Sequence, residues 1–234
     1  MRGRRLHRIL WAVGGIALLY LLVAYLMLPD LWWFRDRGHI DVDGGYVTRT
    51  PDGIAGDPIN IGLIGTREEV ISDFTAAGWS PADKITLESS IGIGLSVVFD
   101  RPDLDAPVST LLYDGRKQDL AFEKRVGRSA DQRNHVRLWM TGPSTPGGPP
   151  LWLGSASFDR GVGVSHDTGQ ITHHIGPDVD AERDRIVADL TAAGDVAGVI
   201  EQPGIGATDD GRNGGGDRYF TDGMISIVTL RTEP

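Results

Sequence analysis

The chain has 234 residues, 40% of them hydrophobic, and its 32 aspartates and glutamates outnumber its 23 lysines and arginines. This length allows one globular domain of ordinary size with an appendage, and the absence of cysteine excludes a disulfide framework and a cysteine-ligated metal site. The formal net charge of -9 is uneven, because residues 1–39 hold six arginines and two aspartates (+4), which leaves -13 for the remainder. We therefore expect no nucleic acid partner, since nucleic acid is bound through a basic face.

An uncharged run of twenty residues extends from Ile9 to Leu28. At about 1.5 Å per residue, a helix of this length crosses the ~30 Å hydrocarbon layer of a bilayer, so we expect one transmembrane helix over 9–28. Four arginines precede it within residues 1–8, and basic residues are retained on the cytoplasmic side. The sequence therefore predicts a single-pass protein of the cell membrane, with a cytoplasmic tail at 1–8 and an extracytoplasmic C-terminal domain.

A cleaved secretory signal is the alternative interpretation of this segment. The apolar core of a signal usually has ~7–15 residues and ends in a small-x-small site, whereas Leu26-Met27-Leu28-Pro29 ends this run. The aromatic residues at 32–34 are typical of a membrane interface. We therefore favour an uncleaved anchor.

We expect residues 29–57 to connect the helix to an outer domain at 58–234. Two segments rich in glycine and proline, Thr141–Pro150 and Gly204–Gly216, are predicted to be surface loops. The second segment lacks the Gly-Lys-Ser/Thr ending of a phosphate-binding loop, so we do not assign it that role.

Two helices have recognisable ends. Thr66 and Glu69 form a capping box before one helix, and Gly78 provides its C-terminal stop. The second begins near Asp178 or Asp180 and ends at Gly194. Short apolar segments between Gly, Pro or Asp indicate strands at 59–64, 91–99, 108–113, 135–140, 151–158, 170–175, 196–200 and 224–230. This pattern predicts an α+β domain in which two principal helices cover one face of a mainly antiparallel sheet.

Three polar blocks stand at Arg133–Trp139, Thr172–Ile175 and Asp178–Asp184. In this order they resemble the LssY C-terminal domain family, over about residues 58–230. The resemblance implies a bacterial membrane-associated protein, in a family where some members carry phosphatase-like or DedA-like membrane domains and a hydrolase-like role has been suggested. This chain has Asn134 where the family more usually has histidine, which weakens the case for a paired-histidine site there.

Side chains two apart on a strand share a face, so His135 and Arg137 are expected to point the same way. Together they could bind an anion such as phosphate, or they could form a cross-strand salt bridge to Asp119 or Asp159. His173 and His174 are adjacent and should face opposite sides of their strand. We expect a hydrogen-bonded core position for His173 and a site position for His174, and the reverse if the face of His173 lines a cleft.

The carboxylates at Asp178 and Asp180 follow the histidine pair, as a mixed histidine and carboxylate metal site would require. Acidic residues in the first turn of a helix also cap free N–H groups, which is the alternative role. The candidate residues are accordingly His135, His174 and Asp180 for catalysis, Arg116, Arg137 and Arg183 for anion binding, and His174, Asp178 and Asp180 for a divalent cation, the one cofactor that the sequence suggests.

Three functions remain open at this stage. The first, which we favour, is a non-catalytic module that acts with an envelope or membrane-protein partner. The second is a hydrolase of a phosphorylated or lipid-linked substrate, and the third is a binding module for an anionic small molecule. Convergence of the histidine, arginine and aspartate blocks in a solvent-reachable cleft would favour the second or third, whereas mutual pairing in the interior would favour the first.

Overall fold

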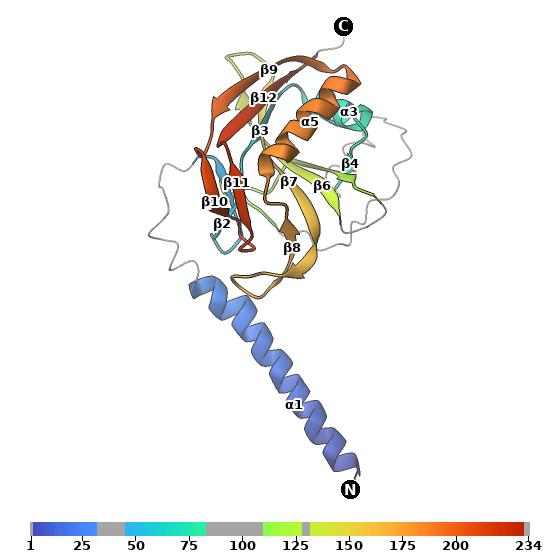
Figure 1. The fold of residues 1–234 in the computed structure, drawn as a ribbon, viewed down its shortest axis with the longest axis vertical. Coiled ribbons are helices and arrows are strands. Elements are labelled where there is room, and N and C mark those ends of the chain that lie inside the picture. Colours follow the sequence, from blue (N-terminus) through green and yellow to red (C-terminus); the bar gives the residue numbers. More distant parts are fainter. Residues whose placement is uncertain (1, 32–44, 83–109, 128–131, 232–234) are drawn as a thin grey trace.

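The computed structural model describes residues 2–31, 45–82, 110–127 and 132–231. Its N-terminal part is a long helix in which α1 (Arg2–Leu22) continues through a π-helical turn, η1 (Val23–Met27), as Figure 1 shows. The stretch Arg4–Leu31 is long and apolar enough to span a membrane, and almost none of its surface is buried by the rest of the chain. The predicted apolar helix is therefore present and projects from the folded domain.

A sheet of eight strands forms the centre of the domain. Its order is β4-β5-β6-β7-β3-β12-β9, and β8 pairs with the C-terminal half of the long strand β7. Only β3 and β12 are parallel among these described pairs. The strands are β3 (Ile61–Ile64), β4 (Ser80–Pro81), β5 (Leu120–Arg125), β6 (Arg133–Pro143), β7 (Pro150–Val164), β8 (Ile171–Ile175), β9 (Val196–Pro203) and β12 (Met224–Leu230).

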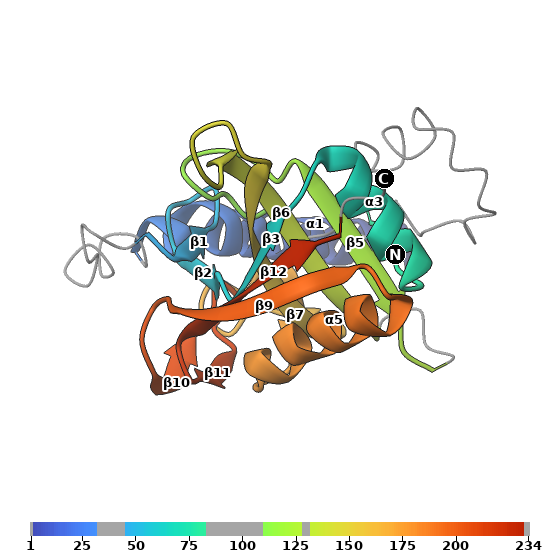
Figure 2. The same cartoon turned by 90° about the horizontal axis from the view of Figure 1, so that it is seen from above.

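Two helices, α3 (Arg67–Ala76) and α5 (Val179–Ala193), cover one face of this sheet (Figure 2). Their ends lie where the sequence predicted, because the Thr66 capping box is formed and Gly194 takes the left-handed conformation after α5. The core beneath them contains Trp79 and Trp152, both fully buried. The α+β class with a mainly antiparallel sheet is thus confirmed.

Two small hairpins lie beside the sheet, and Figure 2 shows one of them next to the first turn of α5. One consists of β1 (Val47–Arg49) and β2 (Ala55–Pro58), and the other of β10 (Thr208–Arg212) and β11 (Arg218–Thr221). Folded structure therefore begins before residue 58, within the segment expected to be a connector.

Some strand predictions need correction. The segment Gly204–Gly216 is not a loop throughout, because its middle forms β10, and β5 was not predicted at all. In the predicted strand at 108–113, Leu112 and Tyr113 form isolated bridges, to Arg49 and Arg116, instead of a regular strand. The predicted strand at 91–99 lies outside the described residues.

Candidate functional site

Strand β6 separates apolar and polar side chains onto the two faces of the sheet. Val136 and Leu138 join the core beneath the helices, while His135 and Arg137 lie on the other face, which confirms the predicted alternation. Cross-strand neighbours in β7 are polar as well, since His135 is opposite Ser157 and Arg137 is opposite Ser155. The result is a strip of buried polar residues across the centre of the sheet.

Arg133 holds one end of this strip together. Its guanidinium donates to Glu123 Oε2 at 3.0 Å and to Asp159 Oδ2 at 3.2 Å, and its Nη2 lies 3.3 Å from His173 Nε2. Because arginine can only donate, Nε2 of His173 accepts this bond. The salt bridge to Asp159 that the sequence suggested for His135 or Arg137 is therefore formed by Arg133 instead.

His135 is buried, with 2% of its surface exposed. Burial, together with the neighbouring charges of Arg137 and Arg133, places the pKa of His135 well below its usual 6.5, so the ring is neutral at pH 7. Among the described residues, its Nδ1 has no hydrogen-bond partner, and neither have the hydroxyls of Ser155 and Ser157. The strip thus has unused hydrogen-bonding capacity.

A cavity of about 240 Å³ adjoins the strip. Arg137, Asp159 and His173 line it from the sheet, and Asp57 lines it from β2. Nη1 of Arg137 lies 4.0 Å from Oδ2 of Asp57. Burial raises the pKa of Asp57 against the opposing effect of Arg137, and the negative charge of Asp159 raises it further. The remaining lining mixes polar and apolar residues. It comes from the turn between β7 and β8 (Ser165, Thr168, Gln170), from β8 (Ile171, Thr172, Ile175), from residues 213–215, and from Thr50, Pro51, Asp52, Thr110 and Leu111.

The rim of the cavity also contacts the N-terminal helix. The Tyr20 hydroxyl donates to the Gly169 carbonyl at 2.7 Å, and the Tyr25 hydroxyl accepts from the Ile171 amide at 3.3 Å. Gln170 and Ile171 of the same turn line the cavity. The cavity therefore lies at the end of the domain that is next to the helix.

The two adjacent histidines face opposite sides of β8, as predicted. His173 lines the cavity, whereas Nδ1 of His174 lies 2.8 Å from Oδ1 of Asp217 on the other side. The sequence predicted a site position for His173 if its face of the strand lined a cleft, and His173 does line the cavity.

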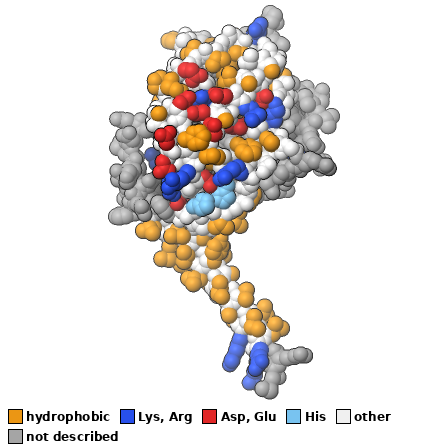
Figure 3. Space-filling view, in the orientation of Figure 1, with side chains coloured by type: hydrophobic (Ala, Val, Ile, Leu, Met, Phe, Trp, Pro, Cys, Tyr) orange, Lys and Arg blue, Asp and Glu red, His pale blue; other side chains and the backbone are white. Residues whose placement is uncertain are grey.

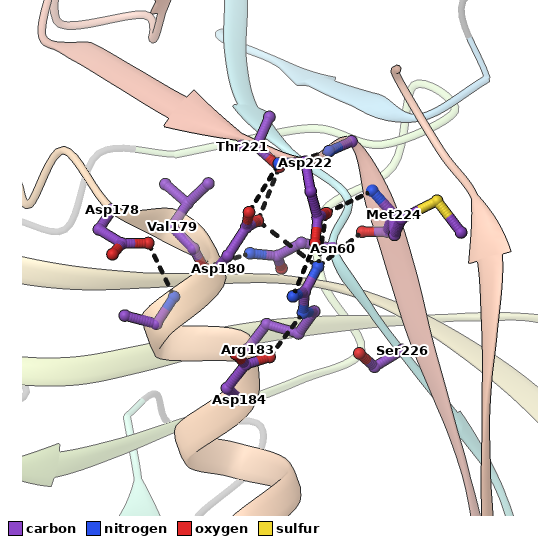
Figure 4. A network of polar contacts seen from close by, with 12 residues as sticks. Asn60, Asp178, Val179, Asp180, Arg183, Asp184, Thr221, Asp222, Met224 and Ser226 are labelled. Atoms are coloured by element: carbon purple, nitrogen blue, oxygen red, sulfur yellow. Dashed lines mark hydrogen bonds and ion pairs between the residues drawn. The ribbon is translucent and has the colours of Figure 1, made fainter. Parts of the chain in front are cut away.

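The acidic block at the start of α5 has structural partners (Figure 4). Asp178 caps the helix by accepting from the Ala181 amide at 3.0 Å. Asp180 accepts from the Thr221 hydroxyl and from the Asp222 amide, both at 2.7 Å. Among the described residues, His174 clusters with His166 and Asp217, and these three could hold a metal ion together. The predicted ligands Asp178 and Asp180 are not part of this cluster.

The three arginines predicted to bind an anion have separate carboxylate partners. Arg116 lies 3.5 Å from Asp119, and Arg183 forms two hydrogen bonds with Asp222 at 2.8 and 3.1 Å. Only Arg137 lines the cavity. The structure therefore does not bring the predicted arginines, or the predicted catalytic residues, to one point.

Sequence reasoning missed the cavity residues Asp57 and Asn213 and the histidine at 166. Asp57 lies in the segment taken as a connector, and Asn213 lies in the glycine-rich segment taken as a loop, so neither stood in a recognisable motif. Asp159 was considered only as a partner in a salt bridge.

The family model described as LssY C-terminus matches residues 40–225. The chain belongs to this family. The match begins before β1, so the LssY C-terminal region includes the β1–β2 hairpin as well as the sheet. No match was found among curated proteins or among solved structures. An LssY C-terminal domain behind an apolar N-terminal helix fits a membrane-anchored protein.

Proposed function

We propose that this protein crosses the cell membrane once, with its N-terminus in the cytoplasm and its LssY-family domain outside. Arginines at 4, 5 and 8 precede the apolar stretch of the helix, and such residues favour the cytoplasmic side. Tyr25 lies near the opposite end of the apolar run, where aromatic residues favour the interface between membrane and water.

In this arrangement the β7–β8 hairpin lies closest to the bilayer, because its turn contacts Tyr20 and Tyr25. The hairpin carries Val162, Val164 and Ile171, each about half exposed. Apolar side chains grouped beside a membrane helix gain free energy when the interfacial region of the bilayer covers them. These residues therefore support a domain that rests on the membrane surface.

We propose that the cavity binds the hydroxyl-rich head group of a lipid or lipid-linked molecule, which makes the protein an accessory, ligand-binding module of the cell envelope. The observation that carries this proposal is the position of the cavity, because the turn that forms its rim also contacts the helix. A ligand held in the bilayer can reach this rim without leaving the membrane. The volume of about 240 Å³ suits one small polar group, since drug-sized ligands need ~300–1,000 Å³.

The chemistry of the lining favours hydroxyl groups over a phosphate. Asp57 and Asp159 place two carboxylates beside Arg137, and the raised pKa of Asp57 indicates that further negative charge is unfavourable there. Carboxylates accept from hydroxyls, while arginine and threonine side chains can donate to them. A sugar or polyol head group uses both kinds of partner.

A hydrolase is the second candidate, and the same lining supports it in one respect. Two carboxylates in one cavity can serve as general acid and general base, and the pKa of Asp57 is raised, as a general acid requires. His135 and Asp180 give less support, because one is buried and the other is engaged with Thr221 and Asp222.

Lipid retention in native mass spectrometry tests the binding proposal. The full-length protein is placed in phosphatidylcholine nanodiscs that contain a minor fraction of either monoglucosyl diacylglycerol or phosphatidylglycerol. We expect the glucolipid to be retained preferentially, and Gln170→Ala, at the rim, to lower retention about fivefold, the effect of losing roughly one hydrogen bond. Gln202→Ala, an exposed glutamine on β9, is the matched control and should retain the lipid normally.

Equal retention of the glucolipid and phosphatidylglycerol would contradict head-group binding. Equal retention of the glucolipid by Gln170→Ala and Gln202→Ala would contradict it as well. Release of free glucose from the glucolipid would identify the protein as a hydrolase instead. Co-purification of one membrane protein, with no lipid preference, would favour a purely partner-binding module.

A further inference from the structure

A second cluster of polar side chains lies outside the cavity, on the other side of β8. Nδ1 of His174 lies 2.8 Å and Nε2 of His166 lies 3.6 Å from the same oxygen, Oδ1 of Asp217. One ligand atom from each of the three residues lies within 4.8 Å of the other two. Figure 3 shows histidine side chains together on the surface at the end of the domain next to the helix.

The surrounding backbone leaves room for the His174 ring and holds the Asp217 carboxylate in place. Gly163 lies beneath the His174 ring, where a Cβ would overlap the imidazole. The buried Asp217 carboxylate is fixed at its other oxygen, because Oδ2 accepts from the Ile175 amide at 3.0 Å. The Asp217 amide in turn donates to Asn213 Oδ1 at 2.9 Å. Oδ1 is thereby held facing both histidines.

We propose that His166, His174 and Asp217 bind one divalent transition-metal ion, such as Zn²⁺. Two imidazole nitrogens and one carboxylate oxygen form a known ligand set for this ion, with metal–ligand distances of about 2.0–2.2 Å. Two ligand atoms at such distances from one tetrahedral ion lie about 3.4 Å apart. Binding therefore replaces the 2.8 Å hydrogen bond between His174 Nδ1 and Asp217, releases its proton to solvent, and turns the exposed His166 ring toward the ion. Solvent can fill the remaining positions, since 63% of the His166 side chain is exposed.

One neighbouring cation competes for the same oxygen. Nη2 of Arg160 lies 3.8 Å from Oδ1 of Asp217, but its side chain is half exposed and its Nε donates to the Ile175 carbonyl at 2.6 Å. The flexible end of Arg160 can therefore move away when an ion binds. The bound ion would join the β7–β8 hairpin, which carries His166 and His174, to the segment 213–217 before β11.

Isothermal titration of the full-length, untagged protein in detergent micelles with ZnCl₂ tests this site. We expect one Zn²⁺ per chain, little heat with MgCl₂ because Mg²⁺ prefers oxygen ligands, and a higher melting temperature with Zn²⁺. His166→Ala should weaken Zn²⁺ binding at least tenfold without affecting the fold, since this side chain is mostly exposed. The control His7→Ala removes an exposed histidine from the N-terminal helix and should leave binding unchanged.

His174→Gln provides a second variant, which keeps a hydrogen-bonding side chain beside Asp217. Zn²⁺ binding that is lost in both site variants, each with a wild-type circular dichroism spectrum, confirms the site. Absence of Zn²⁺ binding to the wild type overturns the proposal, and so does binding that persists in His166→Ala or disappears in His7→Ala. These outcomes do not depend on whether the cavity binds a lipid head group.

Discussion

His135 lies between Arg133 and Arg137 on the cavity side of β6, and it illustrates how burial limits a titratable residue. Its position on the polar face follows from strand alternation, which a sequence reveals. Its burial and its unpaired Nδ1 depend on distant strands, which a sequence does not reveal. A neutral, buried imidazole is a poor proton acceptor, so we expect its effect on stability to exceed its effect on any reaction.

The variant His135→Leu tests this view. It replaces a buried polar ring by an apolar side chain, so the free energy of unfolding at pH 7.5 should change by only about 1 kcal/mol. On acidification, His135 takes up a proton below pH ~6.5 in the unfolded chain but stays neutral in the folded chain, which destabilises the wild type. The variant lacks this histidine and therefore lacks this contribution. Relative to wild type, the variant should therefore gain stability between pH 7.5 and pH 5.5, by at most about 1.4 kcal/mol.

Urea unfolding of the full-length protein at the two pH values measures this difference. His7→Leu is the control, because His7 is exposed on the helix and should show no comparable gain. An equal difference between wild type and His135→Leu at both pH values would contradict a depressed pKa.

At the scale of the secondary-structure elements, the acidic block Asp178–Asp184 holds the start of helix α5 in place. Asp178 caps its first turn, and Asp180 and Arg183 connect it to the residues before β12. Asn60 adds a further connection, since its amide donates to the Val179 carbonyl at 2.9 Å (Figure 4). The block thus positions a helix against the sheet.

Removal of the cap in Asp178→Ala should lower the free energy of unfolding by about 1 kcal/mol, because the Ala181 amide loses its acceptor. Urea unfolding measures the loss, and Asp209→Ala, at an exposed position in β10, is the control. Zn²⁺ affinity should be the same in Asp178→Ala and in wild type. A loss of Zn²⁺ binding in this variant would instead support the metal site first suggested by the sequence.

The elements differ in how far their sequences predict them. The ends of α3 and α5 were predictable because a cap and a glycine stop act within a few residues. The hairpin β10–β11 was not, because a glycine-rich segment resembles a loop until Gly211 pairs with Tyr219. The cavity was equally hidden, since Asp57 and Arg137 meet only through long-range packing.

At the scale of the whole molecule, the contact between helix and hairpin sets the orientation of the domain relative to the helix. Tyr20 and Tyr25 hold one turn of the β7–β8 hairpin, while the helix before Tyr20 is exposed from residue 4 onward. These two hydrogen bonds restrict the tilt of the domain against the helix, and in the proposed membrane arrangement they keep this edge of the domain toward the bilayer.

Tyr20→Phe removes the hydrogen bond to the Gly169 carbonyl and should loosen this turn. Hydrogen exchange of the amides at 169–171 in nanodiscs should become about fivefold faster, as expected for the loss of roughly 1 kcal/mol. Trp11→Phe, at an exposed position far along the helix from the domain, is the control and should leave exchange unchanged. Unchanged exchange in Tyr20→Phe would show that the helix does not hold the hairpin.

The parallel pair of β3 and β12 has a consequence for biosynthesis. Ile61 pairs with Ser226, and the other neighbour of β3, strand β7, also follows it by many residues. During synthesis β3 therefore emerges long before either of the strands that flank it, while the apolar helix before it is already available to the membrane insertion machinery. The strands from β3 to β7 can pair as soon as β7 has been synthesised, whereas the other edge of β3 stays open until β12, the last strand of the sheet, is available.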